Sequence, residues 1–350
     1  MINAFCFYFG DDGWSHHARN FFAAWQKTEP VRIISWNEPG KEDGRFTAAD
    51  RTSASTSDPG IGLGPIERMT SIVGSRRIAY VMWETTILPA DKAAILQTMD
   101  EVWTPSHWGR QVLIDNKIDA AKVGVVPGGV DVESFRRRPE TNDRCRPFRF
   151  LCVGKWEQRK GVEDLINAFC DCFKRDEPVE LVLHCFNPYL PGFDLEAHLR
   201  RAVPLNGPAI IASHPTNQDG LIRLYNSCDA FVLPTRAEGW GLPITEAMAC
   251  ELPVIVTEYS APLEYLSPAF AYLIPVEKMI SAHDPHFFPA NGLGLWAQPD
   301  FQSLRRLLRH VFESPAEVRE KGRRARAEVC RQWTWDHAVS KAQRLISRCA

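Results

Sequence analysis

Short apolar runs alternate with longer stretches of helical periodicity along both halves of the chain. In the first half we expect strands over 4–9, 31–35, 78–82, 101–104 and 123–126, and helices over 15–27, 89–99 and 106–116. In the second half we expect strands over 148–153, 181–186, 209–212, 230–233, 254–256 and 271–274, and helices that include 162–173, 300–313 and 315–332. Such alternation predicts doubly wound parallel sheets of the α/β class.

One stretch interrupts this alternation in the first half. Residues 38–65 are rich in Gly, Ser, Asp and Pro and show neither helical nor strand periodicity. We therefore expect a long loop or a partly disordered insertion there. Since long loops often serve binding sites, we place contacts to an acceptor substrate in this segment.

The composition agrees with a two-domain chain and narrows its setting. With 350 residues, 45% of them hydrophobic, the chain is long enough for two separate cores. A net charge of −2 gives no reason to expect nucleic acid as a partner. The 10 cysteines are scattered without a CxxC pair, which favours reduced core residues and the cytoplasm. The N-terminus has no basic leader, and no apolar run approaches the roughly 20 residues that span a bilayer.

The segment 234–250, PTRAEGWGLPITEAMAC, carries the most specific chemistry. It follows the apolar strand 230–233, and Pro243 suits the first turn of a helix, where its missing N–H costs nothing. Gly239 and Gly241 allow a tight bend in which backbone N–H groups approach a ligand beside the positive end of the helix dipole. The turn therefore predicts a phosphate site.

Two carboxylates flank this turn, and their spacing carries a family resemblance. Glu238 stands just before the glycines and Glu246 early in the helix, with seven residues between them. Carboxylates accept hydrogen bonds from sugar hydroxyls, so the simplest ligand of the whole segment is a nucleotide sugar. The segment resembles the EX7E signature of retaining GT-B glycosyltransferases, family 4 (glycosyltransferase group 1) in particular. Glu251 departs from the family pattern, which commonly has Gly at this point.

A second constellation supports the resemblance from an independent part of the chain. The apolar strand 148–153 ends at Gly154, and cations follow at its exit. In the family, a basic residue just after this Gly and a lysine just before the next one bind the donor pyrophosphate, and Lys155 and Lys160 take those positions here. The family more often has Arg at the first, so Lys155 would act as a point charge rather than a bidentate fork.

The resemblance also implies roles for the residues of the motif. Glu246 would hold the ribose hydroxyls of the donor, and Glu238 a hydroxyl of its sugar. The remaining donor-binding residues, which would present backbone groups to sugar and phosphate or lie beside them, are Gly239, Trp240, Gly241 and Leu242.

The implied architecture is the GT-B fold, two Rossmann-like doubly wound domains facing across a cleft. We expect an N-terminal acceptor-binding domain over 1–138, a linker over 139–147, and a nucleotide-sugar-binding domain over 148–335. A helix over 336–350 would cross back to the N-terminal domain. The resemblance covers most of the chain, weakly in the first half and strongly in the second.

In the first half of the chain, we select candidate site residues by their position after the expected strands. In relatives, a glycine in the first loop lets the backbone approach the donor, and Gly13 is the matching candidate. His16 and His17 follow it; we expect exposed helix residues, with catalysis as the alternative. After the strand 78–82 the family often has a His, where this chain has Glu84. Glu84 would orient the acceptor hydroxyl, take its proton or hold a sugar hydroxyl, the alternative being an ion-paired residue at the edge of the cleft.

The mechanism follows from the groups present. No Asp-x-Asp follows an apolar strand, so we expect no metal and no cofactor besides the donor; Lys155, Lys160 and the helix end would carry the charge of the leaving group. Retention by double displacement needs a carboxylate close beneath the anomeric carbon. The family argument points instead to front-face substitution, in which the departing phosphate helps deprotonate the acceptor.

Alternatives and partners remain open. The rivals are a non-catalytic nucleotide-sugar-binding subunit and a GT-B sugar-nucleotide epimerase. We expect contacts to the nucleotide base near 184–187 and 211–214, but these residues do not identify the base. The expected acceptor is a glycan, a lipid-linked molecule or a small molecule. The arginine-rich segment 305–331 makes peripheral binding to the inner face of a membrane one alternative. The acidic residues interspersed in this segment favour instead a helix face exposed to solvent.

Overall fold

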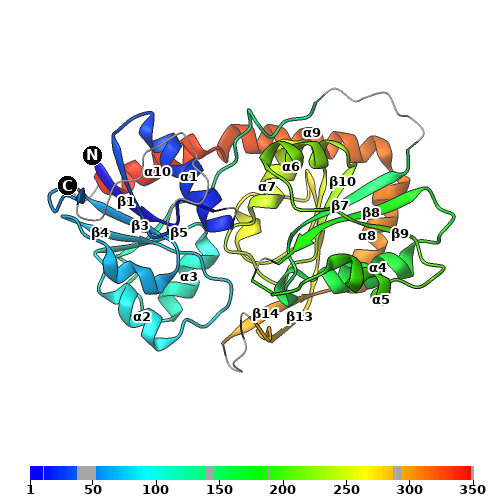
Figure 1. Ribbon diagram of the computed structural model, residues 1–350, viewed down its shortest axis with the longest axis horizontal. Coiled ribbons are helices and arrows are strands. Elements are labelled where there is room, and N and C mark those ends of the chain that lie inside the picture. Colours follow the sequence, from blue (N-terminus) through cyan, green and yellow to red (C-terminus); the bar gives the residue numbers. More distant parts are fainter. Residues whose placement is uncertain are drawn as a thin grey trace. The chain divides into compact units, whose positions relative to one another are not determined.

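A computed structural model describes residues 1–10, 12–37, 53–138, 146–187, 189–286, 288 and 293–347 (Figure 1). The chain divides into two compact units, and each has its own parallel sheet. Unit 1 comprises Met1–Asp131 and Gln332–Ala350, and unit 2 comprises Val132–Arg331. Parts of three expected segments lie outside the described residues: 38–52 of the loop, 139–145 of the linker and 348–350 of the C-terminal helix.

Six parallel strands form the sheet of unit 1, in the order β2-β1-β3-β4-β5-β6. They are β1 (Ile2–Cys6), β2 (Val31–Ser35), β3 (Gly60–Leu63), β4 (Arg77–Tyr80), β5 (Glu101–Thr104) and β6 (Val123–Val125). The chain runs from β1 outward to β2 and then returns to the other side of β1. The point where the strand order reverses therefore lies between β1 and β3, where ligands bind in such sheets.

Helices cover both faces of this sheet. They are α1 (Gly13–Gln26), α2 (Ala90–Gln97), α3 (His107–Asp115) and α10 (Trp335–Ser347), with a 3-10 helix η2 (Ile66–Ser71). Figure 1 shows α1 and α10 on one face and α2 and α3 on the other. The Asp12 side chain begins α1 by accepting a hydrogen bond from the Ser15 amide at 2.9 Å, which satisfies one of the helix's unpaired donors.

The C-terminal helix is part of unit 1. It packs against α1, and Lys27 Nζ lies 2.7 Å from Asp336 Oδ1. The Val130 amide donates a hydrogen bond to the carbonyl of Trp333 at 2.9 Å. The segment that leaves unit 1 and the segment that returns to it are therefore hydrogen-bonded to each other. A Cβ at Gly129 would lie 2.5 Å from the Trp335 nitrogen, which explains the glycine there.

The strand β3 corrects one expectation, because we interpreted 38–65 as a loop throughout. Residues 60–63 form a buried strand between β1 and β4. A Cβ on Gly60 would lie 2.4 Å from the carbonyl oxygen of Val73, and one on Gly62 would lie 2.4 Å from Ile72 Cδ1. Close packing demands glycine here, and glycine removes the apolar pattern by which a strand is recognised.

Unit 2 has a second six-stranded parallel sheet, in the order β12-β11-β10-β7-β8-β9. Its strands are β7 (Phe148–Lys155), β8 (Val179–Phe186), β9 (Ala209–Ala212), β10 (Ala230–Leu233), β11 (Val254–Thr257) and β12 (Ala271–Ile274). From β7 the chain moves outward to β8 and β9, then returns to β10 on the other side of β7. This is the strand order of the Rossmann fold, with its switch point between β7 and β10.

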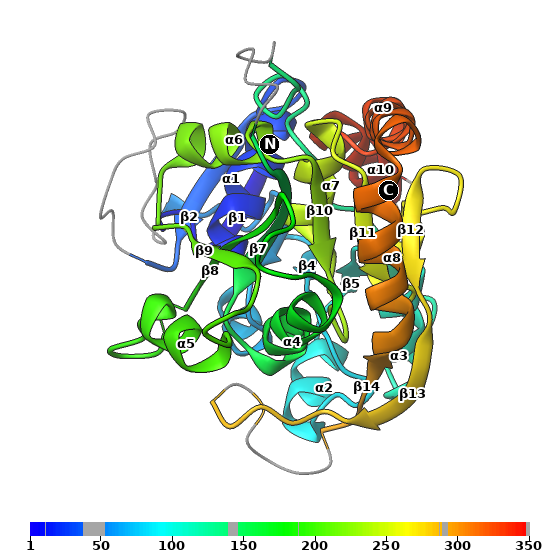
Figure 2. The same cartoon turned by 90° about the vertical axis from the view of Figure 1, so that its right-hand side faces the viewer.

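Six helices flank this sheet: α4 (Val162–Cys172), α5 (Leu195–Ala202), α6 (Gln218–Asn226), α7 (Leu242–Ala249), α8 (Phe301–Glu313) and α9 (Pro315–Gln332). In Figure 1, α4, α5 and α8 lie on one face and α6, α7 and α9 on the other; Figure 2 shows α8 running along β12. Aromatic rings fill the α4 side of the core, with Phe169 4.8 Å from Phe173 and 6.1 Å from Phe150 between ring centroids. Two doubly wound α/β units are therefore confirmed.

An antiparallel pair of strands, which we did not expect, completes unit 2. Strands β13 (Val276–Ser281) and β14 (Leu295–Pro299) form their own two-stranded sheet. The buried Trp296 of β14 packs with Ala237 and Ala282, and the Ala297 amide donates to the carbonyl of Arg236 at 3.0 Å. The pair therefore supports the loop that follows β10.

Candidate functional site

Two loops meet at the switch point of unit 2. One leaves the carboxyl end of β7 and contains η3 (Gln158–Lys160), and the other leaves the carboxyl end of β10 and leads into α7. Gly161 adopts φ +67°, and a Cβ there would lie 2.4 Å from the carbonyl oxygen of Pro234. Only glycine allows both the left-handed conformation and this close approach. The loops thus bring together residues that lie about 80 positions apart in the sequence.

Four charged side chains form a buried cluster between these loops. Lys160 Nζ lies 2.7 Å and 2.9 Å from the two carboxylate oxygens of Glu238. Arg159 lies 3.5 Å from Glu238 and donates to Glu157 Oε1 and to the carbonyl of Ala237, both at 2.6 Å. Each of these four charged residues is at most 8% exposed. Removing one partner would leave a buried charge uncompensated, a change that costs about 3–5 kcal/mol.

The cluster keeps Glu238 ionised. Burial alone would raise the pKa of Glu238, but the neighbouring cations of Lys160 and Arg159 outweigh burial and hold its pKa below the ordinary value. The Glu238 amide donates to Ser260 Oγ at 2.9 Å, so the backbone of this residue is fixed as well. A carboxylate held in this way can accept hydrogen bonds from a ligand hydroxyl without first reorganising.

Lys155 lies at the open side of this cluster. Its ammonium is 3.8 Å from Glu157 Oε2 and 5.4 Å from the centre of the Tyr189 ring. Its side chain is 41% exposed, unlike that of Lys160, which is 8% exposed. Lys155 is therefore exposed enough for an anion to reach it from solvent. Lys160 is buried and bound to Glu238.

The glycine turn between Glu238 and α7 has a tight, aromatic-lined geometry. Gly241 adopts φ +94° and stands as the residue before the first turn of α7. The Tyr265 hydroxyl donates to the carbonyl of Trp240 at 2.7 Å, and the two rings lie 4.8 Å apart. A Cβ on Gly241 would lie 2.8 Å from that same hydroxyl oxygen. Leu242 is the first residue of α7, so the glycine turn leads directly into the N-terminus of this helix.

Glu246 lies in α7 and has a different partner. The Tyr225 hydroxyl, from α6, donates to Glu246 Oε2 at 2.9 Å. Glu246 is 5% exposed, and burial raises its pKa to about 7, against the smaller opposing effect of the Tyr225 hydrogen bond. The two glutamates of the motif are thus distinct: Glu238 is a carboxylate between cations, and Glu246 is a carboxyl group that titrates near neutrality.

The segments expected to contact the base meet at the carboxyl ends of β8 and β9. His184 Nδ1 lies 3.2 Å from Ser213 Oγ, and burial lowers the pKa of His184, so its ring is neutral at pH 7. Asn187 is buried and donates to the carbonyl of Trp156 at 2.9 Å. These residues lie at the carboxyl ends of β8 and β9, on the same edge of the sheet as Lys155 at the end of β7.

The candidates of the first half lie in unit 1. Gly13 is the exposed first residue of α1, after the loop that follows β1, and a Cβ there would contact nothing within 4 Å. Glu84 is half-buried in the loop that follows β4. His17 is 1% exposed, so our expectation of an exposed residue was wrong. Its ring lies 4.8 Å from that of Trp335 and 5.2 Å from that of Tyr80, inside the core where α10 packs on α1.

Sequence reasoning missed several residues that complete the unit 2 site. Arg159 and Glu157 stand beside the lysines that we selected, and only burial distinguishes them from surface charges. Tyr225 and Ser260 come from α6 and from the segment after β11, with no motif of their own. The available signal was the run 155–160, which has three cations in six residues at the end of a buried strand.

Neither a metal cluster nor a membrane-spanning helix is found in the described part of the chain. Within it, no group of three or more His, Cys, Asp and Glu side chains is arranged to hold a metal ion. Its helices are all too short or too polar to cross a bilayer.

Comparison with known proteins gives a family match for part of unit 2. Residues 147–282 match the family described as "Glycosyl transferases group 1". A 149-residue stretch is 28% identical to a probable sucrose-phosphate synthase of Thermosipho melanesiensis, covering 41% of this chain and 34% of the relative. A 160-residue stretch is 29% identical to a D-inositol 3-phosphate glycosyltransferase of Paenarthrobacter aurescens, covering 43% of this chain and 37% of the relative. The chain thus spans about a third of the length of these curated relatives.

Solved structures resemble the chain over its whole length. HepE of Anabaena, determined in complex with UDP-glucose, superposes with a TM-score of 0.75 at 13% identity, covering 99% of both chains. Sucrose-phosphate synthase of Thermosynechococcus elongatus superposes with a TM-score of 0.71 at 15% identity, covering 99% of this chain and 98% of the other. At this level of identity the likeness shows a shared fold, and it confirms the expected GT-B class of two Rossmann-like domains.

Proposed function

We propose that this protein is a retaining glycosyltransferase of family 4, which moves a sugar from a nucleoside diphosphate to an acceptor hydroxyl without a metal ion. Two kinds of comparison support transfer from a nucleotide sugar. The part of unit 2 that carries the site matches group 1 glycosyl transferases, and a protein of the same fold binds UDP-glucose. The acceptor class stays broad: a glycan, a lipid-linked sugar or a small molecule such as the inositol phosphate named for one relative.

The observation that carries the proposal is the buried contact between Lys160 and Glu238 at the switch point of unit 2. A cation for phosphate and a carboxylate for sugar hydroxyls lie side by side there, beside the N-terminus of α7. This edge of a Rossmann-type sheet is where nucleotides bind. A nucleotide sugar is the ligand that needs both groups at a single point.

Each side chain has a separate task in the proposed reaction. Glu246 holds the ribose hydroxyls, Glu238 holds a hydroxyl of the donor sugar, and Lys155 and Lys160 stabilise the pyrophosphate. Backbone groups of Gly239, Trp240, Gly241 and Leu242 present hydrogen bonds to sugar and phosphate. No resident cofactor takes part in this scheme.

The bond changes balance on one face of the sugar. The acceptor oxygen bonds to the anomeric carbon while the bond from that carbon to the β-phosphate oxygen breaks. The acceptor proton passes to the departing phosphate oxygen, and the configuration is retained. Gly13 and Glu84 of unit 1 serve this step in our proposal, Gly13 by letting its backbone approach the donor and Glu84 by orienting the acceptor hydroxyl.

The deciding experiment measures release of nucleoside diphosphate from a panel of UDP-, GDP- and ADP-sugars, with and without EDTA. We expect release from one donor that survives EDTA, is lost in Glu246→Ala, and persists in the control Glu313→Ala, an exposed carboxylate at the end of α8. Release that EDTA abolishes would contradict metal independence. Donor binding by calorimetry without release, even with acceptors added, would favour the non-catalytic subunit instead.

A further inference from the structure

A second cavity lies at the opposite edge of the sheet in unit 2. It has a volume of about 520 Å³ and lies against the amino ends of the central strands, at Phe148, Asp229 and Pro253. The first turns of α9 form its other wall. Strand β7 has 8 residues, so the two edges of the sheet are roughly 25 Å apart. This cavity is therefore separate from the donor site.

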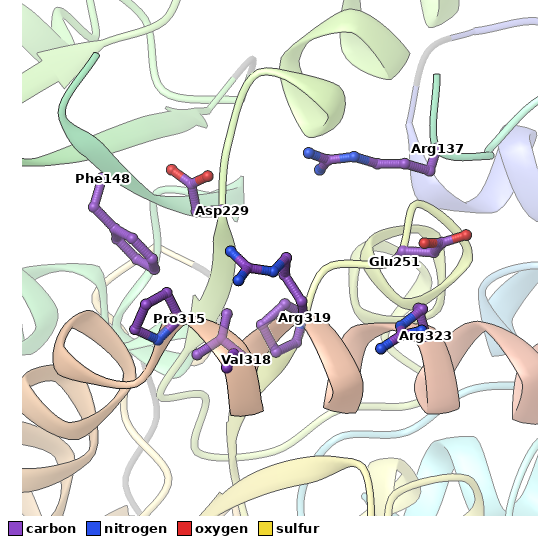
Figure 3. Close-up of a pocket in the computed structure, with 10 residues that line it drawn as sticks. Arg137, Phe148, Asp229, Glu251, Pro315, Val318, Arg319 and Arg323 are labelled. Atoms are coloured by element: carbon purple, nitrogen blue, oxygen red, sulfur yellow. The ribbon is translucent and has the colours of Figure 1, made fainter. Parts of the chain in front are cut away.

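Arginines reach this cavity from two directions. Arg319 and Arg323 rise from α9, and Arg137 extends toward them from the segment before β7 (Figure 3). The two carboxylates that line the cavity, Asp229 and Glu251, each lie beside an arginine that does not line it. Asp229 accepts two hydrogen bonds from Arg146, at 2.6 Å and 2.8 Å, and a third from the Arg149 amide at 2.8 Å.

Among the described residues around the cavity, arginines outnumber carboxylates. Glu251 lies 3.9 Å from Arg326, and Glu320 lies 2.6 Å from Arg323. Counting the lining residues and these partners, five arginines face three carboxylates within the described chain: Arg137, Arg146, Arg319, Arg323 and Arg326 against Asp229, Glu251 and Glu320. Arginine clusters of this kind suit phosphate, because the planar guanidinium binds two of its oxygens at once.

The remaining walls are apolar. Phe148, Pro315 and Val318 give the cavity a hydrophobic side opposite Arg137 (Figure 3), and Pro253 also lines it. A cavity of this volume is large enough for a small ligand with a body as well as a charged group. A free inorganic ion would use the arginines alone and leave this side uncovered.

The end of α7 contributes an acidic residue to the cavity. Glu251 adopts φ +60°, a left-handed conformation that favours glycine, and this explains why the family commonly has Gly at this point. Glu251 directly follows the C-cap of α7; its amide donates to the carbonyl of Met248 and the Leu252 amide donates to that of Ala247, both at 3.0 Å, so its left-handed conformation is an ordinary helix end. Its carboxylate lines the cavity beside the arginines.

We propose that this cavity binds a phosphate-bearing ligand, with the phosphate between Arg137, Arg319 and Arg323 and the body against Phe148 and Val318. The phosphate is carried either by a free metabolite or by a lipid headgroup. The proposal does not rest on the transferase activity, since it uses no residue of the donor site. A ligand at this edge reaches the starts of β7, β10 and β11, whose other ends carry the donor site.

The test measures binding by calorimetry in phosphate-free buffer with saturating UDP, so that the donor site is filled. The probes are inorganic phosphate, glycerol 3-phosphate and glucose 6-phosphate, together with phosphatidylcholine vesicles with and without phosphatidic acid. We expect saturable binding of a phosphomonoester, weakened about tenfold or more in Arg319→Ala, because a charge-assisted bond is lost. Arg331→Ala, which removes an exposed arginine of the same helix that pairs with Glu328, should leave binding unchanged.

The outcomes separate the sources of the phosphate. Binding to the free phosphomonoesters supports a metabolite site, and binding only to vesicles with phosphatidic acid supports a lipid headgroup. Equal binding by wild type and Arg319→Ala, or no saturable binding to any probe, would overturn the proposal. Because UDP binding is measured first and separately, failure of the donor site and failure of this cavity are distinguishable.

Discussion

Ser260 holds a backbone conformation that side chains rarely adopt. Its φ is +62° and its ψ is −151°, a region populated almost entirely by glycine, and holding another residue there costs on the order of 1–3 kcal/mol. In return, its buried hydroxyl accepts the hydrogen bond from the Glu238 amide. A glycine would fit the backbone better but would leave that amide without its acceptor. We infer that Ser260 positions Glu238.

This inference predicts that two small substitutions differ in their effect on stability. Ser260→Ala keeps the strain and loses the acceptor, whereas Ser260→Gly loses both. We therefore expect the Gly variant to be more stable than the Ala variant by roughly 1–2 kcal/mol in urea unfolding, while both lose turnover. Wild-type turnover in Ser260→Gly would show that the position of Glu238 does not depend on the hydroxyl.

The buried carboxyl group of Glu246 predicts a pH dependence of stability. Its pKa is raised from 4.5 to about 7 by burial, so between these values the folded state binds a proton that the unfolded state has lost. Stability therefore falls as pH rises through this window, by roughly 3 kcal/mol at most. Glu246→Gln keeps an acceptor for the Tyr225 hydroxyl but cannot ionise.

The measurement compares free energies of unfolding of wild type and Glu246→Gln at pH 5 and pH 8. We expect similar values at pH 5 and a more stable variant at pH 8, together with weaker donor binding. A difference that does not change with pH would mean that Glu246 titrates near its ordinary value in the folded protein.

Helices and strands with a clear hydrophobic pattern could be predicted from the sequence. Those whose residues are determined by tertiary packing could not. Strands over 31–35, 101–104, 209–212, 230–233 and 271–274 have the predicted bounds, because each is a short apolar run between turns. Strand β3 was missed because two glycines replace its apolar pattern.

In the candidate site, Lys160 and Glu238 were selected separately from their loops. Their contact, and the roles of Arg159 and Tyr225, depend on how distant segments pack, which no local pattern carries.

The packing of α1 on α10 contains one polar group that the core does not satisfy. Both ring nitrogens of His17 are buried between Tyr80 and Trp335, without a hydrogen-bond partner among the described residues. Burial, with a smaller contribution from His16, lowers the pKa of His17 to about 3. Below about pH 6.5 the unfolded state gains a proton that the folded state does not bind, so stability falls as pH falls.

Replacing His17 by Phe should stabilise this packing. The variant keeps an aromatic ring of similar size and removes two unsatisfied nitrogens, so we expect a gain of about 1–2 kcal/mol at pH 7. The gain should widen at pH 5, because only wild type loses stability there. His16→Phe, at the half-buried neighbouring position, serves as the control for a general effect of hydrophobicity. A gain that stays constant between pH 7 and pH 5 would contradict the assigned titration.

At the level of the whole chain, each unit has its own sheet and core, but the chain enters unit 1 twice. It leaves at Asp131 and returns at Gln332, so α10 completes a core that the first 131 residues begin. The proposed donor site, by contrast, has its buried charged side chains in unit 2: Glu157, Arg159, Lys160, Glu238 and Glu246. The stability of unit 1 and donor binding by unit 2 should therefore respond to different substitutions.

Trp335→Ala tests this separation. Trp335 is 6% exposed and contacts His17, and truncating a buried tryptophan costs about 3–5 kcal/mol. In hydrogen exchange followed by mass spectrometry, we expect core peptides of β1, α1 and β4 to exchange roughly a hundredfold to a thousandfold faster. Peptides of β7, β8 and β10 should keep wild-type protection, and UDP should bind as before. Equal loss of protection in both units would instead show that the chain opens as a single cooperative body, so that the return of α10 to unit 1 couples the two cores.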